Sequence, residues 1–545
     1  MFRLRILVLL LVLFLAGCTA SQDSKLPEEG DFPQTEPLLV PQDFATLAAA
    51  LAASEDGDTI LIAPGTYAGR LAIDRRVVVA SQGGQVIIES TLAPLVMLAG
   101  SAGAVVEGIT FRSAGDVVAA IDPSASGVTL RGITLLGTGP ATKGLLALGV
   151  NGLVLQNCQM TTSDKALDCQ GNDLVIRNLT VHLTAALDVP AVILRGANRA
   201  LVDTVTVTAD PGLVMGTLSG GITFLEPATG VRASNLNVTL TGEQLLGVAA
   251  NDLTGAVFDG GLLTTGGNLS RGFQSVDCQN ITVRNFAVVS EVGGILMFAI
   301  NLNSVAGALV ENCQVAAGPL GAGIRFQGVQ DVVVRSNQVV AGAEGITFFD
   351  YAGVLAVENT VFGGFNGIAF NLANASAISK THEVIRCHVI ATTGGGGAGD
   401  VGPALSYRNC IFENCPFGVF TAGTPVLAEN CVISGCDNAV TSFSGDPIVL
   451  VNCILANNQA TFAGAVFGDF NLLFNNLDGA LPLGPNGFVA DPMLNADFTL
   501  AGGSPAIDAG DPGSQYFDVI PPGQGTSRND IGAFGGPDAG RVGAP

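Results

Sequence analysis

The chain has 545 residues, of which 72 are glycine; 48% are hydrophobic, only 13% are charged, and the formal net charge is -23. This length exceeds one ordinary globular core, so the chain forms either several domains or one repetitive structure that grows without thickening. The composition favours many short strands and tight bends with little helix. The negative charge leaves no basic surface for DNA or RNA, and we expect no nucleic-acid partner.

The N-terminus has the features of an export signal. Two arginines precede an apolar run at residues 6–15, which is too short for a lasting membrane span. The sequence LAGC at 15–18 resembles the bacterial lipoprotein box, which implies lipidation of Cys18 and a place at the outer membrane or cell surface. An ordinary signal peptide with an incidental cysteine is the alternative. We therefore expect a signal peptide at 1–18, and residues 19–40, which are acidic and proline-bearing, predict a flexible tether.

A short amphipathic helix is predicted after the tether. Phe44, Leu47 and Leu51 share one helical face. They are predicted to cover the first repeat, whose open end would otherwise expose apolar side chains and strand edges. The sequences GDT at 57–59 and PGTY at 64–67 follow, around an apolar strand.

One six-residue pattern then recurs: apolar, any, Asn, small or apolar, any, apolar. Copies such as VEGITF at 106–111 and IRNLTV at 176–181 follow one another at intervals of 21 to 31 residues. This period, the alternation within each copy and the absence of helix-length segments between copies predict a β-solenoid. The fourth position of the pattern, expected to face the core, falls at Ile109, Ile133, Cys158, Leu179, Val205, Leu236, Gly260, Phe286, Cys313, Asn337, Thr360, Cys387, Cys410, Cys431 and Cys453.

Asparagine precedes cysteine in six places, and this pairing has three explanations: a metal site, a disulfide framework or the repeat itself. In stacked coils each Asn bonds along the stack and tolerates a left-handed bend, while the cysteine packs inward. Disulfides between stacked coils are disfavoured because Cβ atoms about 4.8 Å apart exceed the usual ~3.5–4.5 Å. One or two bridges stay open for an exported protein with ten cysteines beyond Cys18. Zinc is disfavoured because no CxxC pair is present.

A second pattern, Gly-apolar-any-apolar, lies between the copies, as in GIRFQG at 323–328 and GITFFD at 345–350. From residue 38 to about 475 these features resemble the right-handed parallel β-helix of the pectin-lyase-like superfamily, most specifically in the opening helix, GDT and PGTY. The resemblance implies an all-β fold: a single-stranded right-handed parallel β-helix of about sixteen coils at 41–475, with an N-terminal capping helix and a C-terminal cap at 476–545.

The C-terminal segment departs from the repeat. Its sequences SPAIDAG at 504–510 and DIGA at 530–533 resemble the choice-of-anchor Q module, which implies a cap and not a catalytic domain. We expect its acidic side chains to cap turns through bonds to the backbone, and calcium binding is the alternative. The residues concerned are Asp491, Asp508, Asp511 and Asp530.

The resemblance also implies where chemistry would lie, because many members of the superfamily cleave or epimerise acidic polysaccharides along one sheet face. The glycine pattern places Asp168, Arg195 and Arg325 outward on this face, and they are the catalytic candidates, as acid and base groups. The alternative interpretation of Asp168 and Arg195 is an ion pair between successive coils on a solvated face, without a catalytic role. The candidates for substrate binding are Gln170, Gln274, Asn301, Gln327, Phe349 and Asp350, with Asp277 on the same rim.

Other residues add little to an enzymatic reading. The epimerase motif Asp-Pro-His-Asp is absent, and His182, His382 and His388 are scattered, with His382 and a neighbouring Lys and Glu expected on an exposed loop. Most phenylalanines fall at inward positions, whereas Phe349 and Phe420 are the candidates for an outward sugar platform.

We therefore expect a monomeric, exported, lipid-anchored surface protein that binds extracellular or envelope polysaccharide. Its expected partners are polysaccharide and, through the lipid anchor, the outer membrane. A polysaccharide lyase or glycoside hydrolase is the first alternative, and an adhesin or scaffold is the second. No metal site is predicted, and calcium is the only candidate cofactor.

Overall fold

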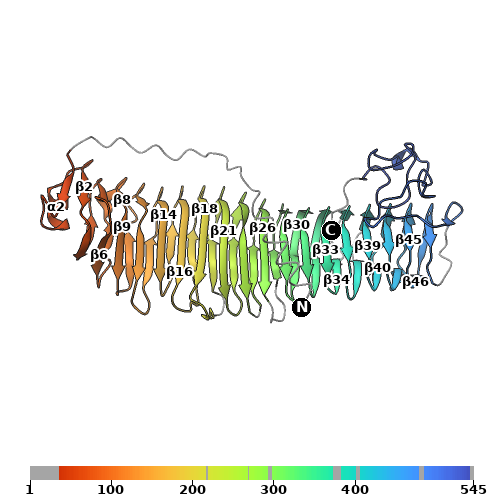
Figure 1. The fold of residues 1–545 in the computed structure, drawn as a ribbon, viewed down its shortest axis with the longest axis horizontal. Helices are drawn as coiled ribbons and strands as arrows, with labels where there is room; N and C mark the ends of the chain where they lie inside the picture. The colour runs from red at the N-terminus through yellow and green to blue at the C-terminus, as the bar shows by residue number, and fades with distance from the viewer. Residues whose placement is uncertain are drawn as a thin grey trace. The chain divides into compact units, whose positions relative to one another are not determined.

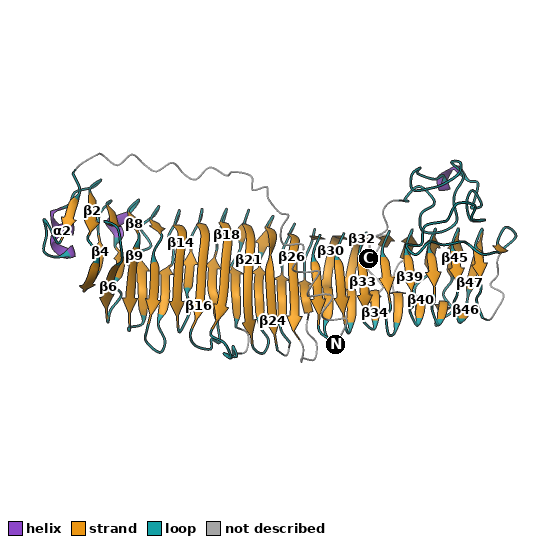
Figure 2. Ribbon diagram, viewed as in Figure 1, coloured by secondary structure: helices purple, strands orange, loops and turns teal. Residues whose placement is uncertain are grey.

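The chain winds into successive coils of short strands. Each strand pairs in parallel with the equivalent strand of the next coil (Figures 1 and 2). The computed structural model describes residues 36–216, 219–267, 269–291, 298–371, 382–399, 405–477 and 484–539. The predicted signal peptide, Cys18 and most of the tether lie outside these ranges. Within the described part, 47 strands belong to one connected set of pairings, which confirms the predicted right-handed parallel β-helix of about sixteen coils.

Each coil contributes to three sheets, which we call A, B and C in chain order. Sheet A contains β1 (Leu38–Val40), β2 (Thr59–Ile62), β5 (Val78–Ser81), β8 (Val105–Glu107), β11 (Thr129–Arg131), β28 (Leu309–Glu311), β35 (His382–Ile385), β38 (Leu405–Arg408), β41 (Val426–Glu429), β44 (Ile448–Val451) and β47 (Val466–Asp469). Sheet B contains β3 (Gly65–Ala68), β6 (Val86–Ser90), β9 (Ile109–Ser113), β12 (Thr134–Gly137), β29 (Gln314–Ala317), β31 (Gln338–Ala341), β33 (Thr360–Gly363), β36 (His388–Ile390), β39 (Ile411–Glu413), β42 (Val432–Ser434), β45 (Ile454–Ala456), β48 (Leu472–Phe474) and β49 (Phe488–Val489).

Some strands pass through a bend and belong to two sheets. Those that join A to B are β14 (Val154–Thr162), β16 (Val175–Leu183), β18 (Leu201–Ala209), β21 (Arg232–Thr241), β24 (Val257–Gly266) and β26 (Thr282–Glu291). Those that join C to the following A strand are β30 (Ala322–Arg335) and β32 (Glu344–Val357). The short pair β20 (Ala228–Thr229) and β23 (Leu253–Thr254) lies between C and A.

Sheet C carries the Gly-apolar-any-apolar strands. Besides the first parts of β30 and β32, it contains β4 (Leu71–Ile73), β7 (Leu95–Met97), β10 (Val117–Ile121), β13 (Lys143–Ala147), β15 (Leu167–Gln170), β17 (Pro190–Arg195), β19 (Gly220–Leu225), β22 (Leu246–Asn251), β25 (Arg271–Val276), β27 (Phe298–Asn303), β34 (Asn366–Asn371), β37 (Gly395–Gly399), β40 (Phe417–Thr421), β43 (Asn438–Ser442) and β46 (Ala460–Ala463).

The predicted helix is α2 (Leu47–Ala53), capped at its N-terminus by Thr46, whose side chain accepts a hydrogen bond from the amide of Ala49. Leu47 and Leu51 are buried in the core at the N-terminal end. Phe44 precedes the helix and packs partly buried against the same core. Among the described residues, no helix is long and apolar enough to cross a membrane.

The bend between sheets A and B explains the asparagines of the repeat. Asn157 and Asn178 have φ angles of 55° and 56°, in the left-handed region that Asn tolerates better than most residues. The Nδ2 of Asn178 donates to the Oδ1 of Asn157 on the preceding coil, at 2.8 Å. The residue after each bend faces the core. At two predicted core positions, Gly260 and Thr360, the prediction is wrong by one residue. In the first case Gly260 itself adopts the left-handed bend, so Gly261 faces inward. In the second case Glu358 adopts the bend, so Asn359 faces inward.

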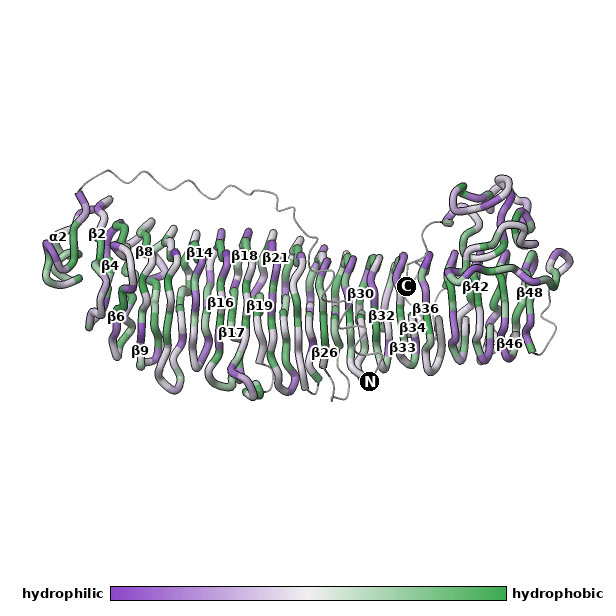
Figure 3. The backbone as a smooth tube through the Cα atoms, in the orientation of Figure 1, coloured by the Kyte–Doolittle hydropathy of each residue, from purple (hydrophilic) through white to green (hydrophobic). Residues whose placement is uncertain are grey.

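The inward positions form columns of like residues. Phe326, Phe348 and Phe370 stack on successive coils with ring centroids 4.9 Å apart, as predicted. All ten described cysteines are buried and unbridged. Among the described residues, no three His, Cys, Asp or Glu side chains are grouped to hold a metal ion. The alternation along the strands is visible as changing hydropathy in Figure 3.

The C-terminal segment packs against the outer face of sheet B over the coils from β36 to β48. Along most of the solenoid the outward position after the bend is polar, for example Thr110, Thr134 and Gln159. In the last coils the same column becomes apolar and is buried by the C-terminal segment. Its members are Ile411, Val432, Ile454 and Leu472. The sequence predicts a cap at the closed end, whereas these apolar residues draw the segment along the side.

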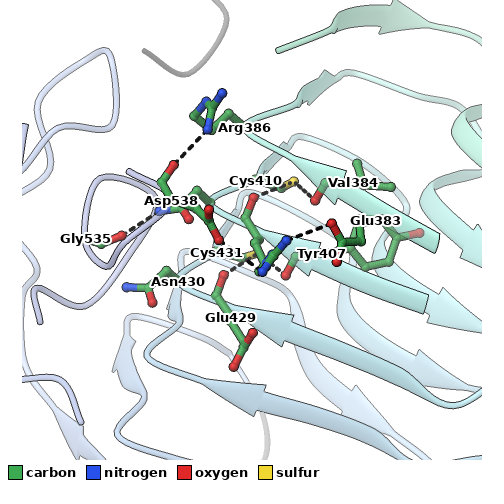
Figure 4. Close-up of polar contacts among 12 residues, drawn as sticks. Glu383, Val384, Arg386, Tyr407, Cys410, Glu429, Asn430, Cys431, Gly535 and Asp538 are labelled. Carbon is green, nitrogen blue, oxygen red and sulfur yellow. Dashed lines mark hydrogen bonds and ion pairs between the residues drawn. The ribbon is translucent and has the colours of Figure 1, made fainter. Parts of the chain in front are cut away.

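Bend asparagines hold this segment in place. The Nδ2 of Asn409 donates to the carbonyl of Ala533 at 3.0 Å, and that of Asn430 donates to the carbonyl of Asp530 at 2.9 Å. Arg386 donates to the carbonyl of Asp538 at 3.1 Å (Figure 4). The last Asn-Cys pairs therefore serve both the bend and the attachment of the C-terminal segment.

The stacked core predicts a large stability difference between phenylalanines. Phe348→Ala removes a buried ring between two others and should cost about 3–5 kcal/mol. Phe467→Ala, in β47, removes a ring that is 56% exposed and should change stability by less than about 0.5 kcal/mol. Thermal and denaturant midpoints would test this. Equal losses for the two variants would contradict the stacked core.

The C-terminal segment should loosen as the pH rises. Burial, together with the charges of Asp530 and Asp508, raises the pKa of Asp518 to about 7. A folded-state pKa above the unfolded value of about 3.9 means that the stabilisation is complete below pH ~4 and is lost as the pH rises through about 7.

Asp518→Asn, which cannot ionise, should reduce this pH dependence and leave the part due to Asp530, whose pKa burial also raises. The readout is hydrogen exchange at the amides of Asp530 and Gly536, which donate to the Asp518 carboxylate, corrected for the intrinsic rate. Asp497→Asn is the control, because the hydrogen bonds that Asp497 accepts from Thr499 lower its pKa. Protection that rises with pH in the unsubstituted chain would contradict the account.

Candidate functional site

The outer face of sheet C is shaped by a bend at the start of each strand. In β25 a Cβ atom on Gly272 would lie 2.2 Å from the Cγ1 of Val288, so Gly272 faces the core. The next residue, Phe273, is also fully buried. Strict alternation therefore fails here, and Arg271 lies outward together with Gln274. This glycine explains how an arginine directly before a core residue reaches the surface.

Parallel register places a set of polar and aromatic residues side by side on four successive coils. Gln274 pairs with Asn301, which pairs with Arg325. Arg271 pairs with Phe298. We call the set the arginine patch: it consists of Arg271, Gln274, Phe298, Asn301, Arg325, Gln327 and Phe349.

Arg325 is held between two aromatic rings. Its guanidinium carbon lies 4.6 Å from the ring centroid of Phe298 on the preceding coil and 4.9 Å from that of Phe349 on the following coil. Its Nη2 donates to the Oε1 of Gln327 at 3.0 Å. Such contacts fix the guanidinium plane without neutralising its charge. A charged group is thus positioned with donors still available.

Arg271 and Arg325 are cations without an ion-pair partner among the described residues. Burial lowers the pKa of Arg271, and the positive charge of Arg325 lowers it further. Burial also lowers the pKa of Arg325, while Glu344 raises it. The Nε atoms of both arginines and the Oε1 of Gln274 are buried without a hydrogen-bond partner. The guanidinium groups of Arg271 and Arg325 carry charge-assisted donors, and such donors suit an oxygen-rich anionic group.

The structure places Asp168 and Arg195 elsewhere. Six coil steps separate Asp168 from Arg325 along sheet C, about 29 Å at ~4.8 Å per step. The Oδ1 of Asp168 accepts from the Nε of Arg195, and its Oδ2 from the Nζ of Lys165, each at 2.9 Å. Burial opposes ionisation of Asp168, but these hydrogen bonds outweigh it and lower its pKa. The carboxylate therefore forms ion pairs with two cations. Its catalytic role stays a prediction.

The remaining predicted binding residues fall into two groups. Gln274, Asn301, Gln327 and Phe349 join the arginine patch. Gln170 lies beside Arg195 and donates to the Oε2 of Glu226 at 3.1 Å.

The two acidic residues predicted to lie on the rim, Asp277 and Asp350, lie at corners of sheet C. Asp350 sits at the corner of β32 with a φ of 47°. Asp277 takes the same kind of corner after β25, with a φ of 53°. Asp277, Ser304 and Gln330 line a shallow hollow of about 340 Å³. The rim therefore carries a hollow at the end of the strands that form the arginine patch.

None of the three histidines lies on the outer face of sheet C. His182, in β16, lies 2.8 Å from the Oδ1 of Asp210, and His388, in β36, lies 3.1 Å from the Oε2 of Glu413. His382 is buried in the core, not on an exposed loop as predicted, because it packs its ring 4.6 Å from that of Tyr351. Burial lowers the pKa of His382 to about 4.

The acidic residues of the C-terminal segment act on the backbone. Asp508 accepts from the amide of Thr526, and Asp530 accepts from the amides of Asp508 and Gln524. Asp491 and Asp511 each accept from the amide two residues ahead. This is the turn-capping arrangement expected from the sequence.

Sequence reasoning missed two members of the arginine patch, Arg271 and Phe298. The signal was present in the sequence RGFQSV of β25, where the arginine directly precedes the glycine. Recognising that this glycine faces the core would have moved Arg271 to the surface.

Comparisons with known proteins give neighbours of low identity. No family model and no curated protein matches the chain. Among solved structures, the A-module of the Azotobacter vinelandii mannuronan C-5 epimerase AlgE6 aligns at 15% identity and a TM-score of 0.34, covering 67% of this chain and 93% of that chain. A variant of the periplasmic alginate epimerase AlgG aligns at 10% identity and a TM-score of 0.30, covering 74% and 78%. Pectate lyase Pel9A aligns at 12% identity and a TM-score of 0.21, covering 89% and 90%.

The ion pairs of Asp168 predict a structural effect on substitution. Asp168→Asn removes the carboxylate shared by Lys165 and Arg195, leaves Arg195 only its 3.9 Å pair with Glu226, and should cost about 1–3 kcal/mol. Asp173→Asn removes the exposed pair with Arg199 and should cause no measurable loss. Thermal midpoints of the two variants provide the measurement. Unchanged stability of Asp168→Asn, with a loss of polymer binding or turnover, would instead support a catalytic role.

Proposed function

We propose that the chain binds polysaccharide carrying anionic sugar residues, with Arg271 and Arg325 receiving a carboxylate or sulfate group. The observation that carries the proposal is the pair of arginines on sheet C that have no acidic partner among the described residues. Elsewhere arginines such as Arg199, Arg335 and Arg386 pair with carboxylates of neighbouring coils. The arginine patch is thus one place on the described surface where positive charge is left for a ligand.

The rest of the arginine patch suits a sugar. Gln274, Asn301 and Gln327 offer amide donors and acceptors on adjacent coils, and such groups bond to hydroxyls. Phe349, which is partly exposed, supplies apolar surface next to the charge, whereas Phe298 is only 7% exposed and packs against the guanidinium of Arg325. The combination of charge, amides and rings fits a hydroxylated anionic ring better than a bare anion.

The net charge of -23 opposes this ligand at long range. Ionic strength near 0.15 M screens that repulsion beyond about 8 Å, whereas the guanidinium groups act at contact distance. The account therefore requires the unpaired arginines, because no general attraction for an acidic polymer exists.

We also infer export and lipidation at Cys18, supported by the LAGC sequence and the apolar run before it. The anchor would hold a monomer at the outer membrane or cell surface, where such polymers occur. The sequences SPAIDAG and DIGA support a choice-of-anchor Q identity for the C-terminal segment.

One observation favours a second candidate, polysaccharide cleavage by β-elimination. Arg271 and Arg325 lie close together on sheet C without an acidic partner among the described residues, so they could neutralise the sugar carboxylate next to the proton that β-elimination removes. Unsaturated chain ends released from a polymer would support this activity, and their absence together with binding would leave the binding function alone.

Removing either arginine should weaken binding. We expect Arg271→Ala and Arg325→Ala each to reduce affinity roughly tenfold or more, since each loses charge-assisted hydrogen bonds. The affinity of Arg325→Lys should lie between those of the unsubstituted chain and Arg325→Ala, because lysine keeps the charge but loses the planar contact with the rings. Arg199→Ala, exposed and far from the patch, is the matched control.

The measurement is retardation of the chain lacking residues 1–18 in gels loaded with polygalacturonate, alginate or chondroitin sulfate. Dextran serves as the uncharged polymer. Retardation by none of the acidic polymers, or equal retardation of the arginine variants and Arg199→Ala, would refute the proposed function.

A further inference from the structure

An exposed aromatic cluster lies on sheet C beyond the arginine patch. It consists of Phe417 and Phe420 on β40 and Phe443, which directly follows β43. The ring centroids of Phe417 and Phe420 lie 5.7 Å apart. The ring of Phe443 lies 5.3 Å from that of Phe417 and 5.9 Å from that of Phe420. Three rings therefore contact one another on the surface, and Phe443 is 59% exposed.

The cluster and the arginine patch share one column of outward positions. From Arg325 the register runs through Thr347, Ala369 and Ala398 to Phe420. Four coil steps separate Arg325 from Phe420, which is about 19 Å at ~4.8 Å per step. The three intervening residue types are small, so no large side chain of this column stands between the two features, although Thr347 (1% exposed) and Ala369 (7% exposed) are themselves buried.

The rings of Phe417, Phe420 and Phe443 need an explanation, because they do not pack in the core. Phe326, Phe348 and Phe370 pack inward, whereas the rings of the cluster lie on the opposite face of the same sheet. Large apolar groups clustered on a surface mark a binding site more often than chance exposure. A second copy of this chain is a poor occupant, because two copies with a net charge of -23 repel each other.

We propose that Phe417, Phe420 and Phe443 form a second contact for the same polysaccharide, which runs along the solenoid axis from the arginine patch. This inference rests on the proposed function. The anionic group binds at Arg271 and Arg325, and the apolar face of a sugar ring further along the chain packs against the phenylalanines. Phenylalanine offers ring surface without a polar group, so this contact selects a C–H face and not a charge.

The arrangement predicts a dependence on ligand length. A short oligosaccharide reaches the arginine patch alone, whereas a long chain spans both contacts and gains affinity from their linkage. Phe443→Ala and the double variant Phe417→Ala/Phe420→Ala should leave the affinity for a disaccharide unchanged. They should weaken binding of the long polymer roughly 2–10-fold for each aromatic ring removed. Phe467→Ala, similarly exposed but on sheet A, should change neither affinity.

The experiment is titration calorimetry of the chain lacking residues 1–18, using disaccharide and polymer of whichever acidic polysaccharide retards it most. Sedimentation of each variant is measured alongside. Weaker polymer binding by Phe443→Ala, with unchanged disaccharide binding, supports the inference. Polymer affinity equal to that of Phe467→Ala overturns it while leaving the arginine-dependent function standing.

Two further results would also overturn the inference. If Phe443→Ala abolishes a concentration-dependent dimer without altering polymer binding, the cluster is a contact between copies. If Arg271→Ala and Arg325→Ala leave disaccharide and polymer binding intact, the proposed function fails, and the inference that rests on it fails too.

Discussion

Parallel stacking at about 4.8 Å is the constraint on which this molecule depends, because it makes the equivalent residue of the next coil the nearest neighbour of every side chain. Inside, like residues stack well, as Phe348 does between Phe326 and Phe370. At the bend, asparagine adopts the left-handed backbone conformation readily, and its side chain hydrogen-bonds to the asparagine of the neighbouring coil, as Asn178 does with Asn157. Repetition therefore stabilises both the core and the corner.

The same constraint is unfavourable for charges on the outside, because like charges would stack on one another. Most arginines avoid this by pairing with an acidic residue one coil away, as Arg335 does with Glu311. Arg271 and Arg325 avoid stacking of like charges in another way. They lie two coils apart in different columns, and Arg325 is flanked by aromatic rings instead of carboxylates. The candidate site is thus the local exception to the charge pairing found elsewhere on the solenoid.

The fold follows from the sequence wherever a single residue determines the geometry. The repeat pattern places Cys158, Cys313 and most other core residues correctly, and it fails at Gly260 and Thr360, where the bend falls one residue away from the position that the pattern predicts. Outward positions are harder to predict because they depend on contacts between segments distant in sequence. Arg271 was missed because Gly272 turns inward against Val288. The side attachment of the C-terminal segment was missed although Ile411, Val432 and Ile454 break the polar column of sheet B.

The most direct test of the account is a crystal structure of the chain lacking residues 1–18 with an acidic oligosaccharide bound. The account predicts a carboxylate or sulfate group within hydrogen-bond distance of the guanidinium groups of both Arg271 and Arg325, with the sugar ring beside Phe298 or Phe349. An oligosaccharide seated at Asp168 and Arg195, or in the hollow beside Asp277 without contact to either arginine, would contradict it.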